Sequence, residues 1–481
     1  MSNSHKEQLI AGLFWSFAGQ ISYWIVALIA NIILARLLTT YEFGQIGIVL
    51  FFIAIARVFT DAGLGGALVR NNKATERDFS TIFLTNLILS IAIVVVLILS
   101  SGSIAKFYND LELKNILIAS SSVILFNAFQ LVQITRLIKN MEFQKKALYD
   151  FIAIFIASTV AIILAIKGFG VWSIVLMQIL ISFFQCSMYW YFEGGIGPWV
   201  FDRSSFRTHY KFGINTTLAS IINTVFKNIY QLILGKYFTI NQTGLYYQAQ
   251  KLQEVPIGVI KSLTSSVVFS SLSKIQEDKN LFNIFYRRII SLFTVAVGLI
   301  CMLIYFYAEN IILMFYGPNW IEAVFYLEIL IISSFFYMQE SFNRIIFKVF
   351  DKTEKILLLE IIKKFVQILS IIIGIISLSI EVLLYGFLIT SVLSFFMNYY
   401  VSRKIQPGLS WHELIVVLKV IIISVVNVII GRVTLETLHI EGFNSFYLTP
   451  LVLIVFLVSI YLMKVSNVIT DIKIAIKTFR R

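Results

Sequence analysis

Long apolar runs occupy most of this 481-residue chain. A helix that crosses a bilayer needs about 20 mainly apolar residues, and about fourteen runs of that length follow one another along the sequence. Charged residues make up 14% of the chain, whereas soluble domains carry roughly 25%. Because helices satisfy their own backbone hydrogen bonds inside a membrane, the sequence predicts an all-α integral membrane protein with about 14 transmembrane helices.

The basic residues behind the net charge of +13 gather in alternate connections between the apolar runs. Segments 70–77, 136–146 and 203–211 are rich in Lys and Arg, whereas the connections at Lys167 and Lys236 carry a single basic residue each. Cytoplasmic loops of membrane proteins have this excess. We therefore expect a multi-pass protein with both termini in the cytoplasm. Because the basic residues form no contiguous stripe, no nucleic-acid partner is expected.

The connections leave little room for chemistry outside the membrane. None exceeds about twenty residues, and an extramembrane catalytic domain usually needs about 50 or more. The sequence has no G-x-x-x-x-G-K-[ST] phosphate-binding loop, and its four histidines are scattered without metal-ligand spacing. We therefore expect no enzyme, no catalytic residues, no metal site and no bound cofactor.

One stretch of the chain matches another at an offset of 200 residues. The segment "ILARLLTTYEFGQIG" (33–47) aligns with "LILGKYFTINQTGLYY" (232–247), so that Arg36 meets Lys236 and Gly44 meets Gly244. Six predicted spans separate the copies, which makes this a parallel repeat, and paired lobes are typical of alternating-access transporters with a substrate site near the midplane.

The repeat predicts two six-helix lobes followed by two further helices. The expected divisions are residues 1–200 for the first six spans and 201–405 for the next six. Residues 406–481 would hold two C-terminal helices and a basic cytoplasmic tail.

Several segments resemble the polysaccharide transporter family, the Wzx-type and colanic-acid-exporter-like flippases of the multidrug/oligosaccharidyl-lipid/polysaccharide (MOP) superfamily, which have a MATE-like fold. The segments "FTDAGLGGALVRN", "MEFQKKALYDF" and "MFYGPNWIEAVFYLEIL" carry this resemblance, which fades after about Ser410. It implies export of undecaprenyl-pyrophosphate-linked oligosaccharide across a bacterial cytoplasmic (inner) membrane. The product would be lipopolysaccharide O-antigen, capsule or exopolysaccharide. Membrane lipids, a polysaccharide polymerase and a chain-length regulator would be its further partners.

Charged residues inside the apolar runs are candidates for the substrate site, because an unpaired charge in a bilayer costs about 2.5–3.5 kcal/mol or more. Arg grips phosphate bidentately and Lys acts as a point charge, and amides hydrogen-bond sugars. The residues expected to bind substrate in a central cavity are Arg57, Lys227, Lys251, Lys261, Asn31 and Gln248. Asp61 and Glu254 are expected to couple transport to an ion, H⁺ or Na⁺.

Simpler interpretations of these charges stay open. Arg57 with Asp61, and Lys251 with Glu254, have the spacing of ion pairs on one helix face. Lys363 and Lys364 are expected to reach the membrane interface rather than a ligand. Where relatives carry an acid in the seventh helix, this chain has Tyr230, so a coupling role cannot be transferred to that position.

Two other functions remain as alternatives. An ion-coupled drug or metabolite antiporter of the same superfamily would favour acidic cavity residues. The charged residues inside the apolar runs are mostly basic, which disfavours this alternative. A membrane-embedded polysaccharide polymerase would be expected to carry a large external loop or an acidic motif outside the membrane, and neither is evident in the sequence.

Overall fold

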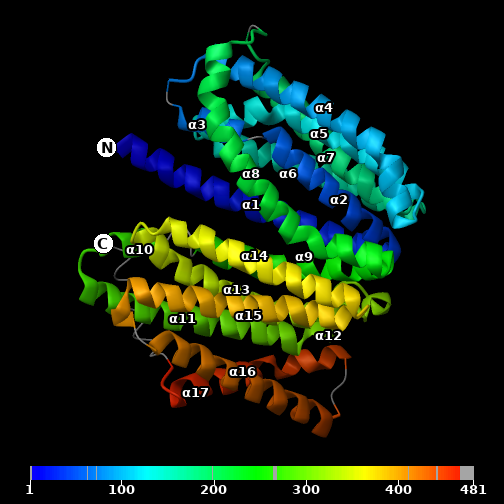
Figure 1. Ribbon diagram of the computed structural model, residues 1–481. Helices are drawn as coiled ribbons and strands as arrows, with labels where there is room; N and C mark the ends of the chain where they lie inside the picture. Colours follow the sequence, from blue (N-terminus) through cyan, green and yellow to red (C-terminus); the bar gives the residue numbers. More distant parts are fainter. Residues whose placement is uncertain are drawn as a thin grey trace. The chain divides into compact units, whose positions relative to one another are not determined.

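The computed structural model describes residues 3–465, apart from 62, 72, 198, 264–267, 410 and 440–441. The structure describes the backbone but not the side chains of residues 3–11, 13, 208–216, 219, 259, 261–263 and 443. The described residues form α-helices and short 3-10 helices and no strand (Figure 1). This confirms the predicted all-α fold.

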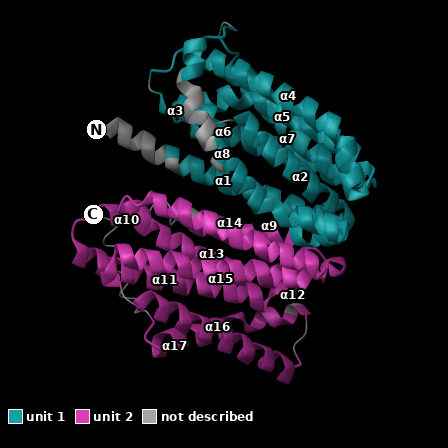
Figure 2. Cartoon of the chain, in the orientation of Figure 1, with its two compact units in different colours: residues 1–247 teal, residues 248–481 magenta. Residues whose placement is uncertain are grey.

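The chain divides into two compact units, residues 1–247 and 248–481 (Figure 2). Unit 1 contains α1 (Asn3–Leu37), α2 (Thr40–Asp61), α3 (Leu64–Arg70), α4 (Glu76–Tyr108), α5 (Glu112–Lys139), α6 (Phe143–Ile166), α7 (Val171–Glu193) and α8 (Arg203–Tyr237). The helix α9 (Ile240–Leu263) begins in unit 1 and continues into unit 2.

The helices of unit 1 pack against one another in pairs. The helices α4, α5 and α7 lie side by side, and α1 packs along α6. The helix α8 packs against α2, α3 and α4, although the sequence placed it in a second lobe that starts at residue 201. The predicted divisions at residues 200 and 405 stay predictions.

Unit 2 contains the remaining elements. They are α10 (Phe269–Ser273), α11 (Lys279–Phe306), α12 (Ala308–Phe315), η2 (Pro318–Trp320), α13 (Ala323–Val349), α14 (Thr353–Ile376), α15 (Ile380–Ile405), η3 (Pro407–Leu409), α16 (His412–Thr437), η4 (Gly442–Leu448) and α17 (Thr449–Leu462). The helix α13 packs against α11, α14 and α15, and α11 packs against α16. Most of the predicted basic tail, from residue 466 on, lies outside the described residues.

Eleven helical segments of the described chain are long and apolar enough to cross a membrane. Three further helices are as long but carry more polar or charged residues: α8 with 35 residues, α9 with 24 and α14 with 24. The chain is thus a multi-pass membrane protein, while the count of fourteen spans stays a prediction.

Local sequence explains where several helices begin and break. Asp202 caps α8 by accepting hydrogen bonds from the backbone amides of Ser204 (3.2 Å) and Ser205 (3.1 Å). Gly63 has φ 63°, in the left-handed region that glycine tolerates, and it separates α2 from α3. The apolar stretch that holds Arg57 and Asp61 is therefore broken directly after these charges.

Candidate functional site

The two connections that carry the repeated sequence contact each other within unit 1. Thr40 at the start of α2 donates a hydrogen bond from Oγ1 to Asn241 Oδ1 at the start of α9 (3.0 Å). A Cβ on Gly44 would overlap the carbonyl oxygen of Ile240, and a Cβ on Gly244 would overlap the carbonyl oxygen of Thr40. The contacts are reciprocal, as an approximate two-fold axis requires, and they support the internal repeat.

The helices α2 and α8 run antiparallel from this contact and hold two of the predicted cations. A Cβ on Gly235 would lie 2.8 Å from Ile48 Cδ1, which puts these two positions at one level. Arg57 lies about 13 Å farther along α2, and Lys227 lies about 12 Å farther along α8, at 1.5 Å per residue. Both residues are exposed. The packing therefore brings an Arg and a Lys to nearly the same depth.

Arg57 and Asp61 do not form the ion pair that their spacing allows. Among the described residues no ion pair joins Arg57 to Asp61, and both are exposed. Thr60 Oγ1 donates a hydrogen bond to the backbone oxygen of Arg57 (3.1 Å). A Cβ on Gly65 would lie 3.7 Å from Asp61 Oδ1, so the carboxylate is next to the first turn of α3. The interpretation of these two charges as a self-neutralising pair is not supported.

The predicted residues of α9 have mixed surroundings. Lys251 and Glu254 lie 4.0 Å apart, with 46% and 35% of their side chains exposed. Gln248 is fully buried, and Asn31 of α1 is half-buried. The side chain of Lys261 lies outside the described residues. Asn31, Arg57, Asp61 and Lys227 thus belong to unit 1, and Gln248, Lys251, Glu254 and Lys261 to unit 2.

Unit 2 contains a buried ion-pair network that sequence reasoning missed. Glu340 on α13 is fully buried and pairs with Arg344 on the same helix. Lys363 on α14 donates a hydrogen bond to Glu340 Oε2 (2.8 Å), and Arg344 also pairs with Glu360. The amine of Lys363 meets the carboxylate of a neighbouring helix, and the expectation that Lys363 reaches the membrane interface stays a prediction. The i,i+4 spacing of Glu340 and Arg344 was the available signal.

A second buried carboxylate joins four helices of unit 2. Glu413 of α16 pairs with Arg403 of α15. It accepts hydrogen bonds from Asn343 Nδ2 of α13 (2.6 Å) and from the hydroxyl of Tyr286 of α11 (3.3 Å). Each donor comes from a different helix, so this contact depends on tertiary packing. The described residues contain no group of three or more His, Cys, Asp or Glu side chains able to hold a metal ion.

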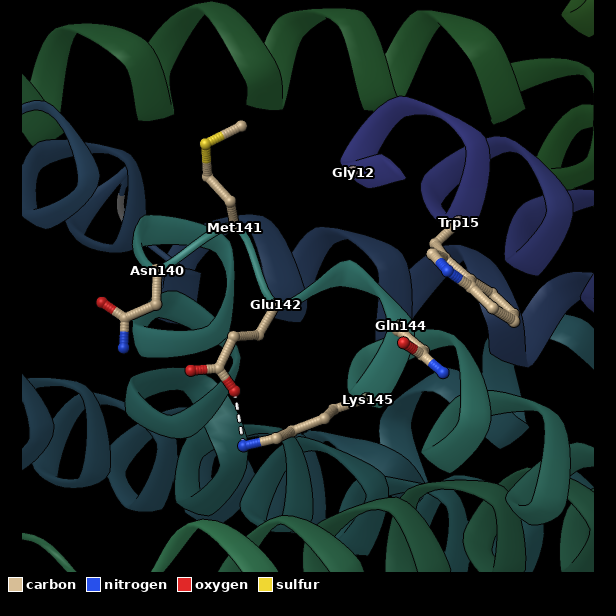
Figure 3. Close-up of a pocket in the computed structure, with 7 residues that line it drawn as sticks. All are labelled: Gly12, Trp15, Asn140, Met141, Glu142, Gln144 and Lys145. Atoms are coloured by element: carbon tan, nitrogen blue, oxygen red, sulfur yellow. Dashed lines mark ion pairs between the residues drawn. The ribbon is translucent and has the colours of Figure 1, made fainter. Parts of the chain in front are cut away.

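A pocket of about 320 Å³ lies in unit 1 between α1 and the connection from α5 to α6. Its lining residues are Gly12, Trp15, Asn140, Met141, Glu142, Gln144 and Lys145. Figure 3 shows the Glu142 carboxylate and the Lys145 amine directed at each other, and they lie 2.5 Å apart. None of these residues was predicted as a site.

Many apolar helices, a repeated helix pair and charges inside the spans are typical of a membrane transporter. The polysaccharide biosynthesis protein family matches residues 33–325, which is more than half of the chain. The chain therefore belongs to this family. It is a multi-pass membrane protein of polysaccharide biosynthesis, the class that the resemblance implied.

One curated relative is similar in sequence, and two solved structures are similar in fold. The lipopolysaccharide biosynthesis protein WzxC of Escherichia coli K12 is 22% identical over 428 residues, covering 86% of this chain and 84% of that protein. The lipid II flippase MurJ in an inward closed conformation has a similar fold, with a TM-score of 0.65 and 15% identity over 98% of this chain and 100% of that chain. An inward-facing MATE transporter of the MOP superfamily gives a TM-score of 0.60 at 15% identity, over 80% and 95%.

Proposed function

We propose that this protein moves undecaprenyl-pyrophosphate-linked oligosaccharides across the bacterial cytoplasmic membrane by alternating access. The observation that carries the proposal is the common depth of Arg57 and Lys227 on the packed helices α2 and α8. Cations inside membrane spans are costly unless they are paired, face a wet site or bind a charged ligand. Membership of the polysaccharide biosynthesis family supports the same substrate class.

The headgroup of such a substrate has an anionic pyrophosphate followed by sugar hydroxyls. An Arg guanidinium offers two parallel N–H donors to phosphate, and a Lys ammonium adds a point charge. Arg57 and Lys227 would bind the pyrophosphate, with Lys251 and Lys261 as further cations. Asn31, which is half-buried, would hydrogen-bond the sugars through its amide. Gln248, predicted for the same role, is fully buried and would have to become accessible during transport. The polyprenyl tail would stay in the bilayer.

Asp61 and Glu254 are proposed to couple transport to H⁺ or Na⁺. Asp61 is exposed and has no ion pair with Arg57 in the described part of the chain, so its carboxylate is available to a cation. Glu254 lies 4.0 Å from Lys251, and a cation at Glu254 would release Lys251 toward an anionic headgroup. The two carboxylates therefore offer one coupling position in each unit.

The orientation and partners are part of the proposal. The excess of Lys and Arg in alternate connections supports cytoplasmic termini. A flipped oligosaccharide is consumed outside the membrane, so a polysaccharide polymerase and a chain-length regulator are the proposed functional partners.

The proposal is tested by mass spectrometry of polyprenyl-pyrophosphate oligosaccharides in cells that lack the gene. The expected result is accumulation of the complete repeat unit on the cytoplasmic side, with rescue by the wild type and weaker rescue by Lys227→Ala. Lys167→Ala is the matched control, because Lys167 is an exposed residue of the connection from α6 to α7. Normal externalisation in the deletion strain, with no redundant carrier, would contradict the proposal and favour the small-molecule antiporter.

A further inference from the structure

The pocket between α1 and the α5–α6 connection has the size of a ligand site. Its volume of about 320 Å³ falls at the lower end of small-molecule sites, which are roughly 300–1,000 Å³. Helix α1 packs closely on the start of α6, because a Cβ on Gly12 would lie 3.2 Å from a ring carbon of Phe143. The pocket is therefore built by two packed helices and the turn that precedes the second one.

The charges of the pocket are balanced among its described lining residues. Glu142 supplies one carboxylate and Lys145 one ammonium group. Their side chains are 36% and 51% exposed, so both remain accessible to a ligand. Lys145 also lies 3.6 Å from Glu193, which further offsets its positive charge. A ligand with net negative charge is therefore disfavoured, whereas a zwitterion can pair with both groups.

The border of the pocket is apolar on the α1 side. Trp15, which lines the pocket, is 38% exposed, and its neighbours Phe14 and Phe17 are 64% and 60% exposed. Tryptophan is enriched at the level of lipid headgroups, where its ring contacts both apolar and polar surroundings. The start of α6 and the end of α5 place the polar side of the pocket at an end of membrane-spanning segments. The occupant should thus join a polar headgroup to apolar chains.

We propose that this pocket binds the headgroup of a zwitterionic phospholipid with a primary amine, such as phosphatidylethanolamine. The lipid ammonium group would donate hydrogen bonds to Glu142 and lie over the indole of Trp15. The lipid phosphate would accept from Lys145 and from the amides of Asn140 and Gln144. A bound lipid would hold α1 against the α5–α6 connection. This site is separate from the transported substrate and does not depend on the proposed function.

Native mass spectrometry of the purified, delipidated full-length protein tests this proposal. We expect phosphatidylethanolamine to bind with a Kd about fivefold or more below those of phosphatidylglycerol and phosphatidylcholine with the same acyl chains. Phosphatidylglycerol lacks the ammonium group, and phosphatidylcholine carries a methylated one that donates no hydrogen bond. The difference corresponds to one charge-assisted hydrogen bond. Equal affinity of the wild type for the three lipids would overturn the proposal without any variant.

Matched variants assign the binding to this pocket. Glu142→Gln should remove the preference for phosphatidylethanolamine, whereas Lys145→Gln should weaken the binding of all three phospholipids, because each of them carries the phosphate. Lys146→Gln is the control, because Lys146 follows Lys145 but pairs with Asp150 on α6 (2.5 Å) and does not line the pocket. Unchanged melting temperatures would exclude a loss of fold. Loss of the preference in Lys146→Gln to the same extent, or its retention in Glu142→Gln, would overturn the proposal.

Discussion

Gly44 and Gly244 meet where α2 crosses the first turn of α9, and a Cβ on Gly244 would lie 2.9 Å from the backbone nitrogen of Gly44. The neighbouring atoms are backbone atoms, which cannot turn away as a side chain can. Only glycine at both positions allows the helices to approach this closely. The crossing therefore joins the two copies of the repeated sequence at its most constrained point.

Substitution of Gly44 by Ala should separate α2 from α9. Overpacking of this kind costs about 1–3 kcal/mol, so the melting temperature of the purified protein should fall. Gly102→Ala on α4 is the control, because no atom lies within 4 Å of the Cβ it would add. An equal melting temperature for Gly44→Ala and the wild type would show that the helices do not cross at these glycines.

Replacement of the buried carboxylate Glu340 by Gln should be strongly destabilising. The change leaves Lys363 and Arg344 without one of their charge partners in a buried position, and removal of one member of a buried ion pair costs about 3–5 kcal/mol. Denaturant unfolding in detergent would measure the loss. Glu328→Gln, which breaks a half-exposed pair with Arg432 (3.6 Å), should cost less than about 1 kcal/mol. Similar losses for the two variants would contradict burial of the Glu340 network.

The N-cap of α8 should lose part of its stabilising effect in acid. The Ser205 hydroxyl, followed by the backbone amides of Ser205 and Ser204, donates hydrogen bonds that lower the pKa of Asp202 below its usual value. Because the folded pKa is lowered, this stabilisation is present above the unfolded value of about 3.9 and is lost as pH falls through the folded pKa. Asp202→Asn keeps an acceptor without titrating. The melting-temperature difference between wild type and Asp202→Asn should therefore shrink between neutral pH and pH ~3, and a constant difference would contradict the cap.

Neutralisation of Asp61 should uncouple transport from an ion gradient. Asp61→Asn keeps the size of the side chain but removes the charge that a proton or Na⁺ would neutralise. In vesicles with an imposed gradient, transport by this variant should no longer respond to the gradient, although substrate still binds. A gradient response of Asp61→Asn equal to that of the wild type would contradict this prediction, and the same result for Glu254→Gln would remove both carboxylates from the coupling mechanism.

Hydropathy was sufficient to predict the helical class, because each apolar run in a membrane must satisfy its backbone hydrogen bonds within a helix. The break after Asp61, where Gly63 adopts a positive φ, is a feature of the structure that hydropathy did not locate. The helices α8 and α9 are less apolar than the other long helices. The helix α14 is apolar in its second half but carries Glu360, Lys363 and Lys364 near its middle. Hydropathy alone therefore does not settle the number of spans.

Pairing between helices was beyond the reach of the sequence. Spacing along one helix suggested that Arg57 pairs with Asp61, yet the described structure has no such pair. Spacing along one helix also gave no indication that Lys363 meets Glu340, which lies 23 residues away on another helix. Local spacing defines only which residues share a helix face, whereas the packing of α13 against α14 decides which charges meet. The pocket lined by Trp15 was not predicted either, because it forms only where α1 packs beside the connection from α5 to α6.

The most direct test of the account is a flipping assay with the purified protein in liposomes. A labelled undecaprenyl-pyrophosphate oligosaccharide would be placed in both leaflets, and a membrane-impermeant reagent would report its arrival at the outer surface. We predict that the wild type and Lys167→Ala accelerate the appearance of substrate, while the double variant Arg57→Ala with Lys227→Ala is far slower at equal protein content and melting temperature. No acceleration by the wild type, or equal rates for the wild type and the double variant, would contradict a flippase whose substrate passes these two cations.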